Sequence, residues 1–226
     1  ITNYYSLLAY SIDLSQTFSD ENVEKIFGLL KETLESGNNI AIAASTIIAT
    51  AIIKKDSDRL GPVLEMFGEV IPACMEFDNV DTITLAIKFL LSIADEFKCE
   101  HMEPIIPFIP QVLEYAKNPE TEHRIREASL ELLCSIFHYS TNEEITGPII
   151  PEVIEILDKS LNTENEFSIQ AIDGIRRVAR DLSEEHRLAF FNTLVEAVKE
   201  DFKTTFVSKA LYATAKLIKY MQEEEN

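Results

Sequence analysis

Turn-forming and small residues recur along this chain at a spacing of about 40 residues. Five positions each follow two bulky apolar residues, and they are separated by 44, 38, 41 and 41 residues: Gly28, Pro72, Pro110, Pro151 and Asn192. Five alanines in the segments that follow keep a similar spacing of 42, 42, 43 and 39 residues: Ala44, Ala86, Ala128, Ala171 and Ala210. Two independent markers with one period indicate that a single structural unit is repeated.

Each repeated unit is predicted to contain two helices. Apolar residues recur at intervals of three and four throughout, and alternating β patterns are missing, which is typical of an all-α chain. A two-helix unit near 40 residues falls in the range of HEAT and armadillo repeats. We therefore expect an all-α fold, a HEAT-repeat α-solenoid (an α-α superhelix) of about five repeats plus a half.

The predicted solenoid is a single segment that spans 1–226. Its repeats are expected at 20–55, 60–98, 102–140, 145–182 and 184–221. Residues 1–17 are expected to be the second helix of a truncated repeat. Because solenoids need polar caps and the start of this chain shows no such cap, we expect the segment to belong to a longer array.

Prolines favour HEAT over armadillo repeats. Three Xaa-Pro pairs are predicted to start first helices, where the missing N–H of proline has no effect: Gly61-Pro62, Glu103-Pro104 and Gly147-Pro148. Four further prolines are predicted to lie inside first helices and to bend them: Pro72, Pro107, Pro110 and Pro151. A bent first helix and a straight, alanine-containing second helix are features of the HEAT unit.

The stretch 118–137, NPETEHRIREASLELLCSIF, resembles the HEAT pattern most closely. A HEAT unit has an Asp-Pro turn followed by Val-Arg-x-Ala-Ala. Here Asn118-Pro119 is predicted to end one helix, and Ile125-Arg126-Glu127-Ala128-Ser129 to begin the next. Arg126 is expected to bond loop carbonyls or a neighbouring acid, in a structural role.

Charge and hydropathy exclude several classes of partner. The formal net charge is −19, so phosphates would be repelled, and direct binding of nucleic acid is not expected. A basic protein partner remains possible. The most apolar run, residues 40–53, has 14 residues, whereas a bilayer span needs about 20, so we expect a buried helix and no membrane insertion.

Sequence patterns for catalysis or metal binding are weak. Cys99 and His101 form one C-x-H pair without a second pair at zinc spacing. The segment from Asp56 to Phe67 starts like a calcium loop but has Leu60 and Phe67 where ligands are needed. Dinucleotide, Walker and nucleophile-elbow motifs are missing. We expect no enzyme activity, no metal and no cofactor.

Three cysteines, Cys74, Cys99 and Cys134, lie among apolar neighbours. An odd number of such residues in a chain of this length favours buried, reduced thiols and an intracellular protein.

Polar side chains on the second helices are predicted to line the concave side of the solenoid. Residues four, eight and eleven apart share one helix face. The predicted partner-binding residues on this stripe are Thr84, Lys88, Asp95, Glu127, Glu131, Gln170 and Tyr212. The same stripe includes Thr50, Ser92, Ser135, His138, Gly174 and Asp181. Its charges are of both signs, and only Glu127 and Glu131 form an acidic pair; a simple solvated helix face is the alternative.

Three stretches are similar to the importin-β (karyopherin-β) family of nuclear transport receptors, in particular its importin beta-3 branch. They are residues 40–77, 90–118 and 125–137. They share an order of a small-residue helix, a short polar turn, an aromatic-rich helix with a late Leu/Ile-Pro, and a helix that ends Ile-Ala-Asp. The resemblance covers roughly residues 25–145, and the remainder fits generic HEAT units.

The resemblance implies a function in the cytoplasm and nucleus. Members of the family bind cargo that carries basic or other localisation signals, the GTPase Ran in its GTP form, and Phe-Gly nucleoporins. A long acidic loop found in some members is absent here. The alternative hypothesis is a HEAT scaffold subunit that assembles another complex, such as a phosphatase, a vesicle coat or a translation-related array.

Overall fold

The computed structural model describes residues 8–9, 11–12, 19–68, 70–161, 166–199 and 204–224. Within these residues every regular element is a helix and none is a strand, so the predicted all-α fold is confirmed. The chain divides into two compact units, residues 1–107 and 108–226, where the sequence suggests one continuous segment. The predicted helix at 1–17 lies mostly outside the described residues; residues 8–9 and 11–12 are helical.

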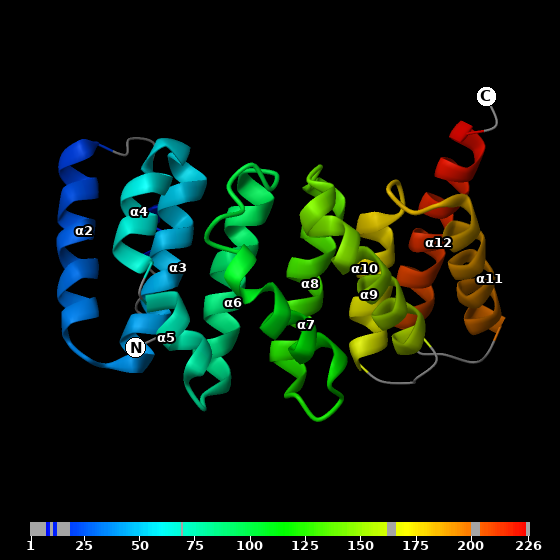
Figure 1. Ribbon diagram of the computed structural model, residues 1–226, viewed down its shortest axis with the longest axis horizontal. Helices are drawn as coiled ribbons and strands as arrows, with labels where there is room; N and C mark the ends of the chain where they lie inside the picture. The colour runs from blue at the N-terminus through cyan, green and yellow to red at the C-terminus, as the bar shows by residue number, and fades with distance from the viewer. Residues whose placement is uncertain are drawn as a thin grey trace. The chain divides into compact units, whose positions relative to one another are not determined.

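Unit 1 (residues 1–107) is built from two helix pairs, the second with a broken first helix. Its elements are α2 (Asp20–Glu35), α3 (Asn39–Lys55), the 3-10 helix η1 (Ser57–Arg59), α4 (Leu60–Phe67), α5 (Val70–Glu76) and α6 (Val80–Glu96). The two second helices, α3 and α6, pack against each other. α2 packs beside α3, while α5 packs against both α3 and α6 (Figure 1).

Unit 2 (residues 108–226) contains three helix pairs. Its α-helices are α7 (Ile109–Lys117), α8 (His123–Tyr139), α9 (Glu143–Leu161), α10 (Glu166–Val178), α11 (Glu184–Lys199) and α12 (Thr204–Glu224). α10 packs between α8 and α12, and α9 contacts both α7 and α11 (Figure 1). Within unit 2, second helices therefore form one layer and first helices the other, which is the α-solenoid arrangement that the period predicts.

The periodic alanines lie where the second helices pack. Each of the five is at most 1% exposed: Ala44, Ala86, Ala128, Ala171 and Ala210. The other periodic set, which begins at Gly28, is exposed on first helices at all five positions. A methyl side chain allows close approach of neighbouring helices without leaving a cavity, and burial of the bulky residues beside it stabilises the stack. The periodic alanines therefore mark the buried core, and the set that begins at Gly28 marks the exposed side of the first helices.

Asparagine side chains begin several helices. Asn38 accepts a hydrogen bond from the backbone N–H of Ala41 at 3.1 Å, and Asn79 accepts one from Thr82 at 3.0 Å. Each cap satisfies a backbone donor that has no acceptor within its helix. Such caps fix the first residues of α3 and α6.

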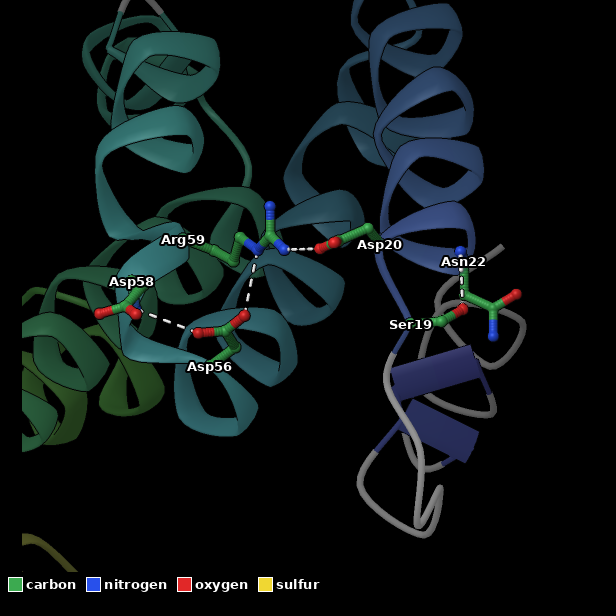
Figure 2. Close-up of polar contacts among 6 residues, drawn as sticks. All are labelled: Ser19, Asp20, Asn22, Asp56, Asp58 and Arg59. Carbon is green, nitrogen blue, oxygen red and sulfur yellow. Dashed lines mark hydrogen bonds and ion pairs between the residues drawn. The ribbon is translucent and has the colours of Figure 1, made fainter.

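The start of α2 is joined to the loop after α3 by one arginine. Figure 2 shows Arg59 reaching from η1 to the carboxylates of Asp56 and Asp20. Hydrogen bonds to Asp56 and then to Asp20 raise the pKa of the Arg59 guanidinium. Asp56 also accepts from the backbone N–H of Asp58 at 3.2 Å. Asp56, the first residue of the apparent calcium loop, therefore acts as a helix cap and ion-pair partner.

Prolines interrupt first helices in two of the predicted places. Pro72 lies in α5, and Gly68 lies in the break between α4 and α5. In a continuous helix the ring of Pro72 would clash with the carbonyl of Gly68, four residues earlier, so the helix breaks there. Pro110 lies in the first turn of α7, directly after the 3-10 helix Ile106–Phe108. α9 in contrast continues through Pro151 without a break.

The predicted helix starts at Xaa-Pro pairs were wrong. Pro62 is the third residue of α4, Pro104 lies in a turn, and Pro148 lies inside α9, which begins five residues earlier at Glu143. The reason in α9 is Asn142, whose side chain accepts from the N–H of Glu144 at 3.0 Å. Pro148 and Pro151 are tolerated because they lie on the exposed side of the helix, where water can bond the freed carbonyls.

The cysteines are only partly as predicted. Cys74 and Cys134 are buried free thiols, whereas Cys99 is half-buried, which corrects the prediction for that residue. Cys99 lies in the turn after α6, where Lys98 and Cys99 both have positive φ angles of 48° and 60°. The turn lifts this side chain out of the helix core.

Candidate partner-binding surface

Unit 1 leaves little of the predicted stripe open. Thr84 was predicted as a partner-contacting residue, but it is only 2% exposed and offers almost no surface to a partner. α6 is buried on most of its circumference, and the helical spacing alone did not reveal how wide that buried face is. Lys88 is exposed and Asp95 is half-buried.

Two further stripe residues of unit 1 hold the second helices together. The hydroxyls of Thr50 on α3 and Ser92 on α6 lie 3.1 Å apart, within hydrogen-bond distance. Ser92 also lies 2.7 Å from the carbonyl oxygen of Lys88. These side chains join helices and are not available as a ligand surface.

Unit 2 brings three predicted residues together in one groove. A cavity of about 110 Å³ lies between α8 and α10. We call it the α8–α10 groove; its lining residues are Glu127, Leu130, Glu131, Cys134, Gln170, Asp173, Gly174, Arg176 and Arg177. Glu127 and Gln170 are half-buried and Glu131 is exposed. The predicted acidic pair and the glutamine of the next repeat thus face a common space.

An arginine of the next repeat compensates one acidic charge of the groove. Arg177 on α10 lies with Nη2 3.5 Å from Oε1 of Glu131 on α8. The same guanidinium donates to the hydroxyl of Ser135. Glu127 has His123 of the same helix as its neighbour, with Nδ1 3.5 Å from Oε2, an ion pair only when the imidazole is protonated. These pairs are long and partly exposed, so each contributes little stability and can be exchanged for a partner's charge.

A second set of contacts extends the groove to α12. Asp173 pairs with Lys209 of α12 and lies 3.6 Å from Nε of Arg176. The guanidinium carbon of Arg176 is 5.6 Å from the ring centroid of Tyr212. Tyr212 is 58% exposed and its neighbour Leu211 is 55% exposed. An exposed aromatic side chain therefore lies next to the charged groove.

Sequence reasoning missed Asp173, Arg176 and Arg177. The predicted stripe on α10 includes Gln170, Gly174 and Asp181, but Gly174 is buried. A Cβ atom at Gly174 would lie 2.9 Å from Leu157 and 3.0 Å from Cys134, so α10 packs closely on α8 and α9 there. The charged residues on either side of Gly174 then reach the groove. The run Asp-Gly-Ile-Arg-Arg was the available signal.

His138 and Asp181 of the predicted stripe are also brought together. Nδ1 of His138 lies 2.6 Å from Oδ2 of Asp181, at the ends of α8 and α10. A chain of polar contacts thus joins α8 to α10 from Glu131 to His138.

Two kinds of site were searched for among the described residues, a metal-ligand cluster and a membrane-spanning helix. No group of three or more histidine, cysteine, aspartate or glutamate side chains there is arranged to hold a metal ion. None of its helices has both the length and the apolar character to cross a bilayer.

Comparisons with known proteins identify the fold and no family. No family model and no curated protein matches this chain. Two engineered proteins with crystal structures from the Northeast Structural Genomics Consortium are similar, each at 14% sequence identity. The first gives a TM-score of 0.62, with 97% of this chain and 92% of that chain covered. The second gives 0.60, with 99% and 58% covered. At this identity the likeness concerns the fold alone.

Proposed function

We propose that this chain is a segment of an importin-β-like nuclear transport receptor that binds protein partners and has no enzyme activity. The proposal assigns a role in the cytoplasm and nucleus, with basic cargo segments, Ran and Phe-Gly nucleoporins as partners. It rests on the resemblance of residues 40–77, 90–118 and 125–137 and on the helical-repeat fold. The α8–α10 groove is the proposed contact for a basic cargo segment.

The observation that carries this assignment is the convergence of acidic and polar side chains from two successive repeats. Glu127, Glu131 and Asp173 line the groove together with Gln170. A lysine or arginine of a partner would compete with Arg177 for Glu131, because the existing pair is long, at 3.5 Å, and partly exposed. Tyr212 offers an exposed ring beside the groove for cation–π or apolar contact.

Charge-neutral variants of the groove test this proposal. We expect Glu127→Gln combined with Glu131→Gln to weaken binding of a lysine-rich signal peptide by about 3- to 10-fold, because each exposed ion pair contributes at most about 1 kcal/mol. Fluorescence anisotropy of the labelled peptide would measure the effect. The matched control is Glu114→Gln with Glu120→Gln, two exposed acids of the same unit outside the groove. Equal weakening in both double variants would contradict a groove site.

Binding of Ran in complex with a GTP analogue is the second test of the proposal. The transport proposal predicts that a chain extended to its full length binds this form more tightly than the GDP form. If neither the peptide nor Ran binds, the proposal is overturned.

The internal pairing of the groove favours one competing function. Because Arg177, Lys209 and Arg176 already compensate Glu131 and Asp173, the same surface also fits a constitutive HEAT scaffold. Such a scaffold would co-purify with a stoichiometric subunit and would not respond to the nucleotide state of Ran.

A further inference from the structure

A second cavity of unit 2 lies among α7, α8 and α9 and shares no lining residue with the α8–α10 groove. Its volume is about 180 Å³. We call it the Arg126 pocket; it is lined by Ala116, Lys117, Arg126, Glu155, Ile156, Lys159 and Ser160. Three cationic side chains from three different helices therefore face one space, in a chain whose net charge is −19.

Arg126 is held in position but lacks an acidic partner among the described residues. Its guanidinium carbon lies 3.9 Å from the ring centroid of Phe167, so the ring supports one face of the guanidinium. Its Nε is buried and makes no hydrogen bond. The expectation that Arg126 bonds loop carbonyls or a neighbouring acid is therefore not met within the described part of the chain.

The Arg126 guanidinium lacks an acceptor for its buried Nε–H group. A buried donor without an acceptor costs free energy, and a guanidinium has five donors arranged to meet planar anions. Loss of solvent lowers the pKa of Arg126, whereas carboxylates raise the pKa of Arg59 and of Arg180. An anion placed against Arg126 would remove this penalty.

The charges around the pocket set the charge of that anion. Lys117 pairs with Glu152, and Lys159 pairs with Glu155. Lys159 also holds the pKa of the Glu155 carboxyl below its usual value, so this group stays ionised. Arg126 is then the one cation of the three that lacks a compensating carboxylate. A single negative charge balances it, whereas a phosphate dianion would leave excess negative charge beside Glu152 and Glu155.

We propose that the Arg126 pocket binds one carboxylate group of a partner polypeptide, an aspartate or glutamate side chain, with Arg126 as the bidentate donor. Lys117 and Lys159 attract the carboxylate, and Ala116 and Ile156 contact its methylene groups. This inference does not depend on the function of the α8–α10 groove, because it concerns a different surface and an opposite ligand charge.

Side-chain NMR of the full chain tests the pocket. The arginine Nε–H signals are recorded during titration with N-acetyl-Ala-Glu-Ala-amide, with the glutamine counterpart, and with sodium acetate at constant ionic strength. We expect a saturable shift of the Arg126 signal with the glutamate peptide and acetate, with millimolar affinity, and at least 10-fold weaker binding of the glutamine peptide. A tighter response to the glutamate peptide than to acetate would assign the site to a polypeptide.

Variants identify the residues that bind. With the backbone amide signals of residues 116, 117, 156 and 160 as the readout, Arg126→Gln should abolish the saturable shifts on peptide addition, and Arg180→Gln, a change to an exposed arginine of the same unit, should leave them intact. If Arg126→Gln does not fold, Lys117→Gln with Lys159→Gln should still weaken peptide binding several-fold without changing the circular dichroism spectrum.

Three results would overturn the proposal. The first is an equal response to the glutamate and glutamine peptides. The second is a Kd for inorganic phosphate at least 10-fold below that for acetate, which would assign the pocket to a phosphoryl group. The third concerns Glu164 and Glu166, which lie just before Phe167 in the sequence: a shift of the Arg126 signal on Glu164→Gln with Glu166→Gln, without added peptide, would mean that the chain fills its own pocket.

Discussion

Burial controls the chemistry of the three thiols. Cys134 is 1% exposed and contacts the closely packed region beside Gly174, and loss of solvent raises its pKa to about 12. Burial also raises the pKa of Cys74 to about 11. Cys99 is the most accessible of the three, yet burial and the charge of Asp95 raise its pKa to about 12. All three are therefore protonated at neutral pH, and a protonated thiol is a poor nucleophile.

Alkylation rates test this account of the thiols. We expect Cys99 to react with iodoacetamide at pH 8 at least 100-fold more slowly than free cysteine, because its reactive thiolate is scarce. Cys74 and Cys134 should react more slowly still, because their side chains are also buried and out of reach of the reagent. Mass spectrometry of native protein over time gives the three rates. Rapid modification of Cys134 in folded protein would contradict the packing around Gly174.

The raised thiol pKa values also give a direction for stability against pH. In the folded chain the thiols keep their protons up to about pH 11 for Cys74 and about 12 for Cys134. In the unfolded chain they lose them near pH 8.5. The stabilising contribution is therefore complete below about pH 8.5 and is lost as the pH rises toward 11 to 12.

For single arginines, the contacts with the neighbouring repeat could not be predicted from the sequence. Arg126 was recognised as the arginine of a HEAT-like unit, but its ring partner Phe167 lies 41 residues away in the next repeat, and no local pattern predicts that contact. Arg177 was missed for a similar reason, because its partners Glu131 and Ser135 belong to the preceding repeat. Contacts between repeats depend on how far one helix shifts along the next.

The end of α6 stores backbone strain in two consecutive residues. The N–H of Cys99 donates to the carbonyl of Ala94 at 3.0 Å, which closes the helix in a Schellman-type turn. The residue at the left-handed position of this turn is Lys98, with a φ angle of 48°, where glycine is the usual residue. A side chain in this conformation costs about 1 kcal/mol or more.

Replacement of Lys98 tests the strain. We expect Lys98→Gly to stabilise the protein by about 0.5–1 kcal/mol, since relief of the Cβ clash exceeds the added freedom of the unfolded chain. The corresponding rise in Tm is about 1–4 °C. Lys98→Ala is the control, because it removes the charge and keeps the Cβ atom; it should give no gain. Equal Tm shifts for both variants would show that charge, and not backbone strain, is responsible.

Helix identity was predictable here, and helix ends were less so. The period and the apolar spacing of three and four predicted the second helices correctly. Both patterns arise from burial, since the alanines at 44, 86, 128, 171 and 210 all lie in the core. The start of α9 was misplaced because Gly147-Pro148 looked like a helix start, whereas Asn142 supplies the actual cap. The burial of Thr84 could not be predicted, because the extent of burial around α6 depends on several neighbouring helices.

At the scale of the whole molecule, the two units use the polar side chains of their second helices differently. Unit 1 uses Thr50 and Ser92 to join its helices, whereas unit 2 leaves the α8–α10 groove open with charges of both signs. A net charge of −19 adds a long-range attraction for basic partners. The groove and this field together support the proposed binding of a basic segment.

The salt dependence of peptide binding is the sharpest test of the proposed contact with a basic segment. A labelled lysine-rich signal peptide and a copy with glutamine at every lysine are titrated with the chain by fluorescence anisotropy, in dilute buffer and at physiological ionic strength. We expect saturable binding of the lysine peptide that weakens steeply with salt, because exposed charges are screened within about 8 Å at physiological ionic strength. Equal binding of the two peptides, or no binding of the lysine peptide in dilute buffer, would contradict it.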